Sequence, residues 1–495
     1  MQISFVGLLV CVGILVAGHY ARATLIVGLL ASWAFGSTAL MTLSSLGGSS
    51  PLIYTSFAAL LVMAVAARRR IWRDLGEVFG NVRPVWVLCG LMLYALAGSW
   101  LFPRLFADQT SVFVQSPTRA GVVEASLGPV SGNITQTGYF ILGGLTCIAL
   151  SVLLLHKDRI DQVRRGFFVW CCLQAGMGGL DLAGKLAGLG DVLLPIRTAS
   201  YSMLTEVNEG GFWRIAGAYS EASAFGGYSL ACLSFCYVYW RKTKSRLAFW
   251  LSAALLILTV LSTSSTAYVA LTVLGIPVAF SVMRSLLSGR LGTADMAIIA
   301  ILAAGLLAAL TISLYDQGFF DPFIGMIDAM VINKANSTSG QERAYWNLKS
   351  LQAFVDTSSL GIGFGSSRAS SWPIAVISQL GLVGSLMMAT LLAVVARGMG
   401  RLKPYVDRET NAVVSSVQAS ALAGVVAASF ASGTADPGMI FFIALAVISA
   451  SRVRARRNRR GAMVELHRTW SMFGPGTHDS ALAQQPMRLS GSVSR

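Results

Sequence analysis

Charged side chains are scarce in this sequence. Only 12% of the 495 residues are Asp, Glu, Lys or Arg, whereas 55% are hydrophobic. A soluble chain of this length would form about three domains with charged surfaces, and this composition excludes that class. The net charge of +16 is spread over short basic clusters between apolar runs. Because no basic face is interleaved with aromatic residues, nucleic acid is not an expected partner.

Residues that commonly bind metals are also few. The chain has four histidines and seven cysteines, and every cysteine lies within an apolar run without metal-ligand spacing to a histidine. The acidic residues are scattered, and those in the loops expected to face outward form no D-x-D pair. We therefore expect neither a metal nor another cofactor, and we interpret the cysteines as small packing residues.

Apolar runs of about 18 to 22 residues recur along the chain, as bilayer-spanning helices require. They predict an all-α fold, a polytopic integral membrane bundle of about 13 transmembrane helices. The expected spans are 3–18, 24–43, 51–67, 84–102, 138–155, 166–187, 221–240, 247–263, 266–283, 294–314, 371–396, 412–431 and 437–451. We expect one membrane domain, 1–451, followed by a basic and largely disordered tail, 452–495.

The distribution of Lys and Arg predicts the orientation of this domain. Of the 38 Lys and Arg residues, 29 fall in one alternating set of loops and in the tail. That set is expected to be cytoplasmic. The N-terminus and three polar loops, 103–137, 188–220 and 315–370, then face outward. The last of these is the largest, and we expect it to contain short helices.

The second outward loop ends in the first candidate site, RIAGAYSEASAFGGYS, which starts at Arg214. Arg214 alone could snorkel at the membrane interface, and Glu221 alone could cap the next helix. Together, beside small residues that permit close helix approach, they favour a functional site. Asp181 and Lys185 are spaced for an i,i+4 ion pair and are interpreted as structural. Asp436, in SGTADPG, is interpreted as part of a simple outward turn.

The largest outward loop holds two more candidates. Glu342 and Arg343 begin a stretch, with Tyr345 and Trp346, that suits a short amphipathic helix on the membrane surface. The segment GIGFGSSRASSW follows. The expected substrate-binding residues are Gly363, Gly365, Ser366, Ser367, Ser370, Tyr345 and Trp346. Glycines at this spacing permit backbone N–H groups to approach an anion, although a flexible loop gives the same pattern.

Three arginines on the outward side share one chemical property. Arg214, Arg343 and Arg368 each carry a permanently charged planar fork that matches phosphate oxygens. A lipid diphosphate is a natural anionic ligand for such a set. Since all four histidines are expected to be cytoplasmic, a general base on the outward side would be a carboxylate, Glu221 or Glu342.

These segments resemble the bacterial O-antigen polymerase/ligase superfamily, most closely the Wzy-like exopolysaccharide polymerases. The resemblance rests on RIAGAYSEASAF, GQERAYWN and GIGFGSSRASS followed by QLGLVGS, and on the layout of helices. It implies an inverting, metal-independent glycosyltransferase of GT-C type in the bacterial inner membrane, active at the periplasmic face. Arg214 and Arg343 match the family's loop arginines, and Arg368 lies in the distal GSSR element. The implied partners are an undecaprenyl-diphosphate-linked oligosaccharide, as donor and acceptor, membrane lipids and a chain-length regulator.

Three functions remain open on the sequence. A polymerase would join lipid-linked repeat units, with the arginines holding the departing diphosphate. A ligase would transfer the glycan to another acceptor, but that branch carries a histidine shortly before its GxxG element. Here Ser370, Ser371 and Trp372 stand upstream of Gly381 and Gly384. A transporter of lipid-linked glycan would place ionisable residues at mid-membrane and often show repeated halves, and neither pattern is evident.

Overall fold

The structure, a computed structural model, describes most of the chain. It covers residues 2–43, 49–115, 121–156, 159–201, 203–205, 208–209, 212–289, 291–315, 324–325, 328 and 337–473. Helices dominate these residues. The strands form two-residue or five-residue antiparallel pairs: β1 (Gln2–Ile3) with β2 (Met41–Thr42), β3 (Ser111–Gln115) with β4 (Val122–Ser126), and β5 (Asn208–Glu209) with β6 (Phe212–Trp213). The predicted helical fold class is confirmed.

Seven helices in the described residues are long and apolar enough to cross a membrane. They are α5 (Pro84–Leu105), α6 (Ser131–His156), α7 (Ile160–Leu186), α10 (Ser265–Leu287), α11 (Thr293–Tyr315), α14 (Trp372–Arg397) and α15 (Arg408–Ala431). Shorter apolar helices are α1 (Phe5–Tyr20), α2 (Leu25–Ala31) with η1 (Ser32–Ala34), α3 (Ile53–Ala66) and α9 (Arg246–Leu261). These lengths are consistent with a helical membrane protein, whereas the number of thirteen spans stays a prediction.

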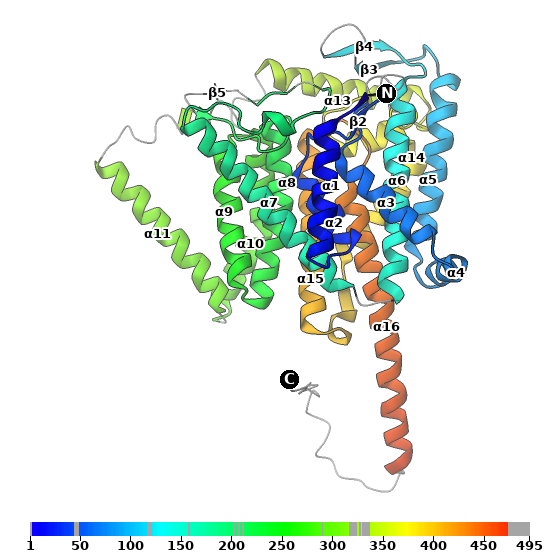
Figure 1. Ribbon diagram of the computed structural model, residues 1–495, viewed down its shortest axis with the longest axis vertical. Helices are drawn as coiled ribbons and strands as arrows, with labels where there is room; N and C mark the ends of the chain where they lie inside the picture. Colours follow the sequence, from blue (N-terminus) through cyan, green and yellow to red (C-terminus); the bar gives the residue numbers. More distant parts are fainter. Residues whose placement is uncertain are drawn as a thin grey trace.

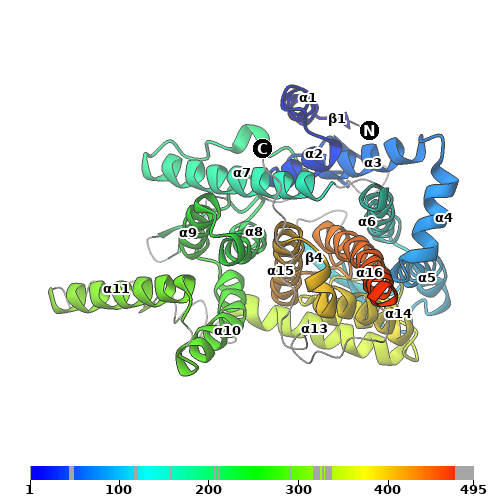
Figure 2. The same cartoon turned by 90° about the horizontal axis from the view of Figure 1, so that it is seen from below.

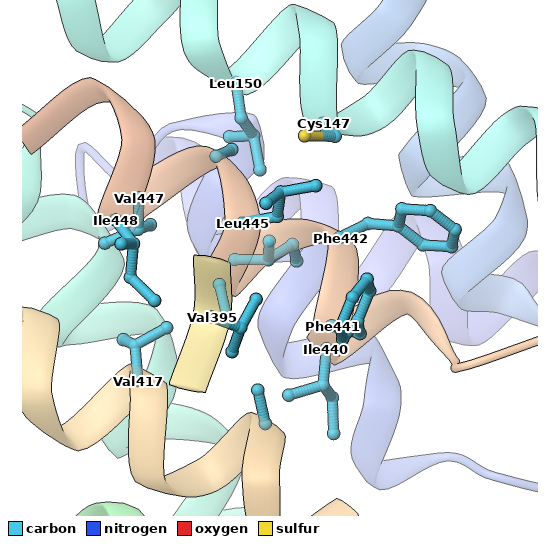
Figure 3. Close-up of a cluster of buried hydrophobic side chains, with 14 of the residues drawn as sticks. Cys147, Leu150, Val395, Val417, Ile440, Phe441, Phe442, Leu445, Val447 and Ile448 are labelled. Carbon is cyan, nitrogen blue, oxygen red and sulfur yellow. The ribbon is translucent and has the colours of Figure 1, made fainter. Parts of the chain in front are cut away.

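The remaining helices complete the fold. They are α4 (Ile71–Asn81), η3 (Leu194–Ile196), α8 (Ala222–Thr243), α13 (Thr338–Asp356), η6 (Gly400–Tyr405) and α16 (Met439–Phe473). Seen along the helices, α15 and α16 lie in the middle, between α8 on one side and α6 and α14 on the other (Figure 2). The apolar first half of α16 is buried on all sides, with Phe441 and Phe442 each only 1% exposed. Figure 3 shows these rings in one apolar cluster that also holds Val395 of α14, Val417 of α15 and Leu150 of α6.

The loops expected to face outward gather at one end of the helical body. The N-terminus, the β3–β4 hairpin, β5 and α13 lie at this end, and α4 and the C-terminal part of α16 lie at the other (Figure 1). We call the end that carries the N-terminus, the hairpin and α13 the outer end. The alternation predicted from the Lys and Arg distribution therefore agrees with the way the described loops are grouped.

One expected span, 24–43, is only partly helical. The helix ends at Ala34, and the chain continues in an extended form to β2. Ser37 and Thr38 are fully buried there. The backbone N–H of Ser37 donates to the carbonyl of Ala218 at 2.9 Å, and the Thr38 hydroxyl donates to the carbonyl of Ile196 at 2.6 Å. Because the 188–220 loop satisfies these groups, the non-helical backbone is tolerated within the bundle.

The expected tail also differs over its first part. Residues 452–473, predicted to begin a disordered tail, continue α16 as helix, whereas 474–495 lie outside the described residues. Arginine favours helix, and the RVRARRNRR segment has no glycine or proline to end it. Arg457 also pairs with Glu77 of α4 at 2.6 Å, which ties this extension to the body.

Candidate functional site

A buried network of ions holds the chain just before α8. Asp181 and Lys185 of α7 form the predicted i,i+4 ion pair, at 3.1 Å. The same Asp181 carboxylate accepts the backbone N–H groups of Ala216 and Gly217 at 2.8 and 3.0 Å. Lys185 also donates to the carbonyl of Arg214 at 2.6 Å. Since breaking a buried pair leaves an uncompensated charge, this network fixes the backbone of the Arg214 segment firmly.

Arg197 completes this network from the preceding loop. Its fully buried guanidinium pairs with Asp191 and lies 3.7 Å from Asp181, and it donates to the carbonyl of Gly217. Two acidic and two basic side chains thus balance one another in the interior. No role was predicted for Arg197, because its contacts with Asp181 and Gly217 depend on how the loop folds back onto α7.

Glu221 stands directly before the first residue of α8. Its backbone is extended, with φ −156° and ψ 160°, and its carboxylate forms no capping hydrogen bond to the helix. Instead the carboxylate accepts the hydroxyl of Ser223 at 2.5 Å. Its side chain lines a cavity between the helices. The capping role considered from sequence is therefore not the one this side chain has.

This cavity, which we call the outer cavity, has a volume of about 460 Å³. It lies among the outer ends of α3, α6, α8 and α15 and the turn that leads into α16. Its polar lining includes Tyr54, Gln136, Tyr139, Glu221, Tyr228 and Asp436. Small side chains of α15, such as Ala427 and Ala428, line another side. A cavity of about 300 to 1,000 Å³ with a few polar groups among apolar walls is typical of a small-molecule site.

Asp436 is a member of this site that the sequence interpretation missed. It lies in the turn of residues 432–438, and one of its carboxylate oxygens accepts the backbone N–H of Gly438 at 2.8 Å. Burial raises the pKa of Asp436 to about 6, although the bond from Gly438 lowers it in part. A signal was present in the sequence. Asp436 is the lone ionisable residue between Glu409 and Arg452, and ionisable residues between apolar spans are functional candidates by default.

The glycine segment, residues 361–370, is not an open loop. Almost all of it is buried, and Gly363 and Gly365 have φ angles of 91° and 79°. A Cβ added at Gly363 would lie 2.7 Å from the carbonyl oxygen of Gly98, and one at Gly365 would lie 2.3 Å from that of Gly132. The two glycines thus allow close contact with the backbones of α5 and α6. Neither position has room even for a methyl group, so both glycines serve close packing here, and their anion-binding role stays a prediction.

The serines of the glycine segment are engaged within the protein as well. The Ser366 hydroxyl accepts the side-chain amide of Asn133 at 2.8 Å, and the Ser367 hydroxyl accepts the backbone N–H of Phe113 at 3.0 Å. The backbone N–H of Gly365 donates to the side chain of Gln379 at 2.9 Å. These contacts join α6, β3 and α14, so Ser366 and Ser367 act as structural links in this geometry.

Helix α13 brings Arg343 close to this region and leaves Glu342 outside it. The Asn347 side chain accepts the backbone N–H of Ser370 at 2.9 Å, so this face of α13 lies on the glycine segment. Arg343 is half-buried and lies one turn before Asn347 on the same face, whereas Glu342 is exposed. Of the two expected partners, only Arg343 faces inward.

Tyr345 and Trp346 contact the β3–β4 hairpin. Both rings lie 5.8 Å from the ring of Phe113, and the Tyr345 hydroxyl donates to Glu124 at 2.9 Å. The hydrogen bonds from Ser111 and Tyr345 lower the pKa of Glu124. These contacts fasten α13 to the hairpin, and a substrate-binding role for the two aromatic residues stays a prediction.

Arg368 lies near the end of the glycine segment and is exposed. Its backbone N–H donates to the carbonyl of Phe113 at 2.9 Å. Its guanidinium lies against Gly433, where an added Cβ would be 3.2 Å from Nε. Ser432 and Thr434, on either side of Gly433, line the outer cavity. Arg368 therefore lies against the turn that forms one side of this cavity.

Arg214 lies in the segment before Glu221 that Asp181 and Lys185 hold in place. The structure thus brings Glu221 and Asp436 to one cavity and Arg368 to the turn beside it, and it places Arg343 on the inner face of α13.

In the residues that the structure describes, no three His, Cys, Asp or Glu side chains gather in a group that could hold a metal ion. Metal independence itself stays a prediction. Comparison with known proteins adds no assignment, since neither a family model nor a curated protein matches this chain.

Proposed function

We propose that this chain is a polysaccharide polymerase that joins undecaprenyl-diphosphate-linked repeat units at the outer end of the bundle. The observation that carries the proposal is the outer cavity, which Glu221 and Asp436 line. Glycosyl transfer from a lipid diphosphate needs a place for the acceptor sugar, a carboxylate to take its proton and cations for the departing diphosphate. The cavity supplies the first two, and Arg368, which lies against the turn beside it, is a candidate for the third.

The proposed roles follow from position. Arg214, Arg343 and Arg368 would neutralise the diphosphate as negative charge develops on it. Glu221 lies in the cavity, whereas Glu342 faces away from it on α13. We therefore retain Glu221 as a site carboxylate and leave Glu342 out of the proposed machinery.

A ligase would be expected to carry a histidine near this site, and the histidines that the structure describes lie elsewhere. His19 and His156, at the last turns of α1 and α6, and His467, in the extension of α16, lie toward the opposite end, and His478 is outside the described residues. His156 is engaged with Asp74 at 2.7 Å. The two carboxylates of the outer cavity lie just before α8 and α16, and a transporter more often places its ionisable groups in the middle of its spans, so a transporter is also less favoured.

Substitution of the arginines tests the proposal. Arg214→Ala and Arg343→Ala are each expected to abolish polymer at a normal protein level, and lysine is expected to restore little because it lacks the planar fork. The measurement is glycan analysis of a deletion strain that carries each variant. Loss of a polymerase leaves single repeat units, loss of a ligase leaves unattached polymer, and loss of a transporter leaves units inside the cell.

Arg104→Ala is the matched control, because Arg104 is also at the outer end but lies over the ring of Trp100, away from the cavity. This variant should make polymer of normal length. Full-length polymer from the Arg214→Lys and Arg343→Lys variants would show that a positive charge alone suffices. Unattached polymer in the deletion strain would show that the protein is a ligase and not a polymerase.

A further inference from the structure

The two carboxylates of the outer cavity come from different elements. Glu221 precedes α8, and Asp436 lies in the turn before α16. Aromatic side chains, including Trp33, Tyr54 and Phe442, line the same space. Rings and a small number of polar groups are the lining expected for a neutral organic ligand of a few rings' size, such as one or two sugar units.

The two carboxylates are not equivalent. Glu221 accepts the Ser223 hydroxyl at 2.5 Å, and Asp436 accepts the backbone N–H of Gly438 at 2.8 Å. Among the described residues, each carboxylate thus accepts one hydrogen bond, on one of its two oxygens. A general base needs an oxygen within reach of the proton that it takes. Because Glu221 is fixed by a side chain of the helix that it precedes, whereas Asp436 lies in a turn at the cavity, we assign the base to Asp436 and the orientation of the sugar to Glu221.

We propose that Asp436 is the general base of the polymerase reaction and that Glu221 positions the acceptor sugar beside it. This inference rests on the proposed function and names the residues that act on the acceptor. The acceptor hydroxyl oxygen forms a bond to the anomeric carbon of the donor. The bond from that carbon to the diphosphate oxygen breaks, and its electron pair leaves with the diphosphate. The hydroxyl proton passes to the Asp436 carboxylate.

The ionisation of Asp436 suits this role. Its pKa of about 6 is raised by burial, so the carboxylate form predominates above pH 6 and is lost as pH falls through that value. A base with a pKa near the working pH combines ionisation with a useful affinity for the proton. The titratable groups that line the cavity with Asp436 are Tyr54 of α3, Tyr139 of α6, Glu221 before α8 and Tyr228 of α8. Tyr201, in the loop before α8, acts on Tyr54 and Tyr228, and Arg368 lies against Gly433 of the same turn.

The test uses the full chain in nanodiscs and the lipid-linked repeat unit that accumulates in the deletion strain. kcat and KM for elongation are measured from pH 5 to pH 8 for the wild type, Asp436→Asn, Glu221→Gln and the control Asp356→Asn. Asp356 is a suitable control because it lies on α13 outside the cavity and accepts a hydrogen bond from Thr110. Size-exclusion profiles confirm that each variant is folded.

The wild type is expected to gain activity as pH rises through about 6, and Asp436→Asn to lower kcat by about 10²- to 10⁴-fold and to remove this pH dependence. Glu221→Gln should mainly raise KM and keep the pH dependence, and Asp356→Asn should match the wild type. If the wild type elongates the substrate while Asp436→Asn retains the transition near pH 6, Asp436 is not the base, and the polymerase function stands. If the wild type elongates no lipid-linked unit, the proposed function fails, and the role of Asp436 fails with it.

Discussion

Two segments of similar composition lie near each other at the outer end, and they have opposite surroundings. The glycine segment, GIGFGSSRAS at 361–370, is buried, and α5, α6 and α14 pack against it. The turn SGTADPG at 432–438 opens onto the outer cavity and exposes Asp436 to it. The glycine segment, predicted to bind an anion, packs closely against its neighbours, and the turn with fewer glycines carries the carboxylate at the cavity.

The difference comes from the helices against which each segment lies. Gly98 and Gly132 offer bare backbone to the glycine segment, so the chain can approach to van der Waals contact. Around the turn before α16, α15 also presents small side chains, such as Ala427 and Ala431, but the described part of the chain leaves a cavity beside them. Small residues therefore permit either close packing or a cavity, and only the arrangement of neighbouring elements decides between them.

The largest effect on stability is expected from Gly365→Ala. The new Cβ would lie 2.3 Å from the Gly132 carbonyl oxygen, on a backbone with φ 79°. Strain at this φ of about 1 to 2 kcal/mol and overpacking of about 1 to 3 kcal/mol should together destabilise the protein by about 3 kcal/mol. The measurement is the thermal midpoint in detergent. Gly138→Ala, where the added Cβ meets open space, is the control. If Gly365→Ala keeps a normal thermal midpoint but makes no polymer, the glycine segment has a binding role.

A smaller loss of stability is expected from Asn133→Ala. The Asn133 amide donates to the carbonyl of Phe364 at 2.9 Å and to Ser366 at 2.8 Å, and both partners are buried. Leaving them unpaired should cost about 2 kcal/mol. The thermal midpoint should fall while elongation per folded molecule stays normal, the reverse of the result expected for Asp436→Asn. Thr135→Ala, at a half-buried position of α6, controls for substitution in this helix. Lost elongation in fully stable Asn133→Ala protein would contradict the structural role.

The smallest effect concerns the contact of α13 with the hairpin. Hydrogen bonds from Ser111 and Tyr345 lower the pKa of Glu124, so its ionised form favours the docked helix. This contribution is complete above the ordinary pKa of Glu, about 4.3, and is lost as pH falls through the lowered value. Hydrogen exchange in α13, corrected for the intrinsic rate, should therefore increase on acidification. In Glu124→Gln the pH dependence of hydrogen exchange in α13 should be weaker. An unchanged pH dependence would show that groups other than Glu124 cause it.

Parts of this architecture could be predicted from local sequence. Runs of apolar residues determine helices of membrane-spanning length, as in α5, α10 and α14, because no other structure satisfies the backbone in lipid. The spacing of Asp181 and Lys185 predicted their ion pair, since residues four apart share a helix face. The residues flanking the spans also predicted which loops share the outer end. Each of these features depends on residues close together in the chain.

The tertiary structure alone decided the use of the functional groups. The sequence alone could not show that Gly365 meets Gly132 or that Arg197 meets Asp181, because these partners are distant in the chain. The same holds for the meeting of Glu221 and Asp436 at one cavity, which depends on how α8, α15 and α16 pack. A sequence determines which groups are present and which helix faces they share. Whether a polar or small residue is packed, paired or left facing a cavity depends on the space that distant helices leave around it.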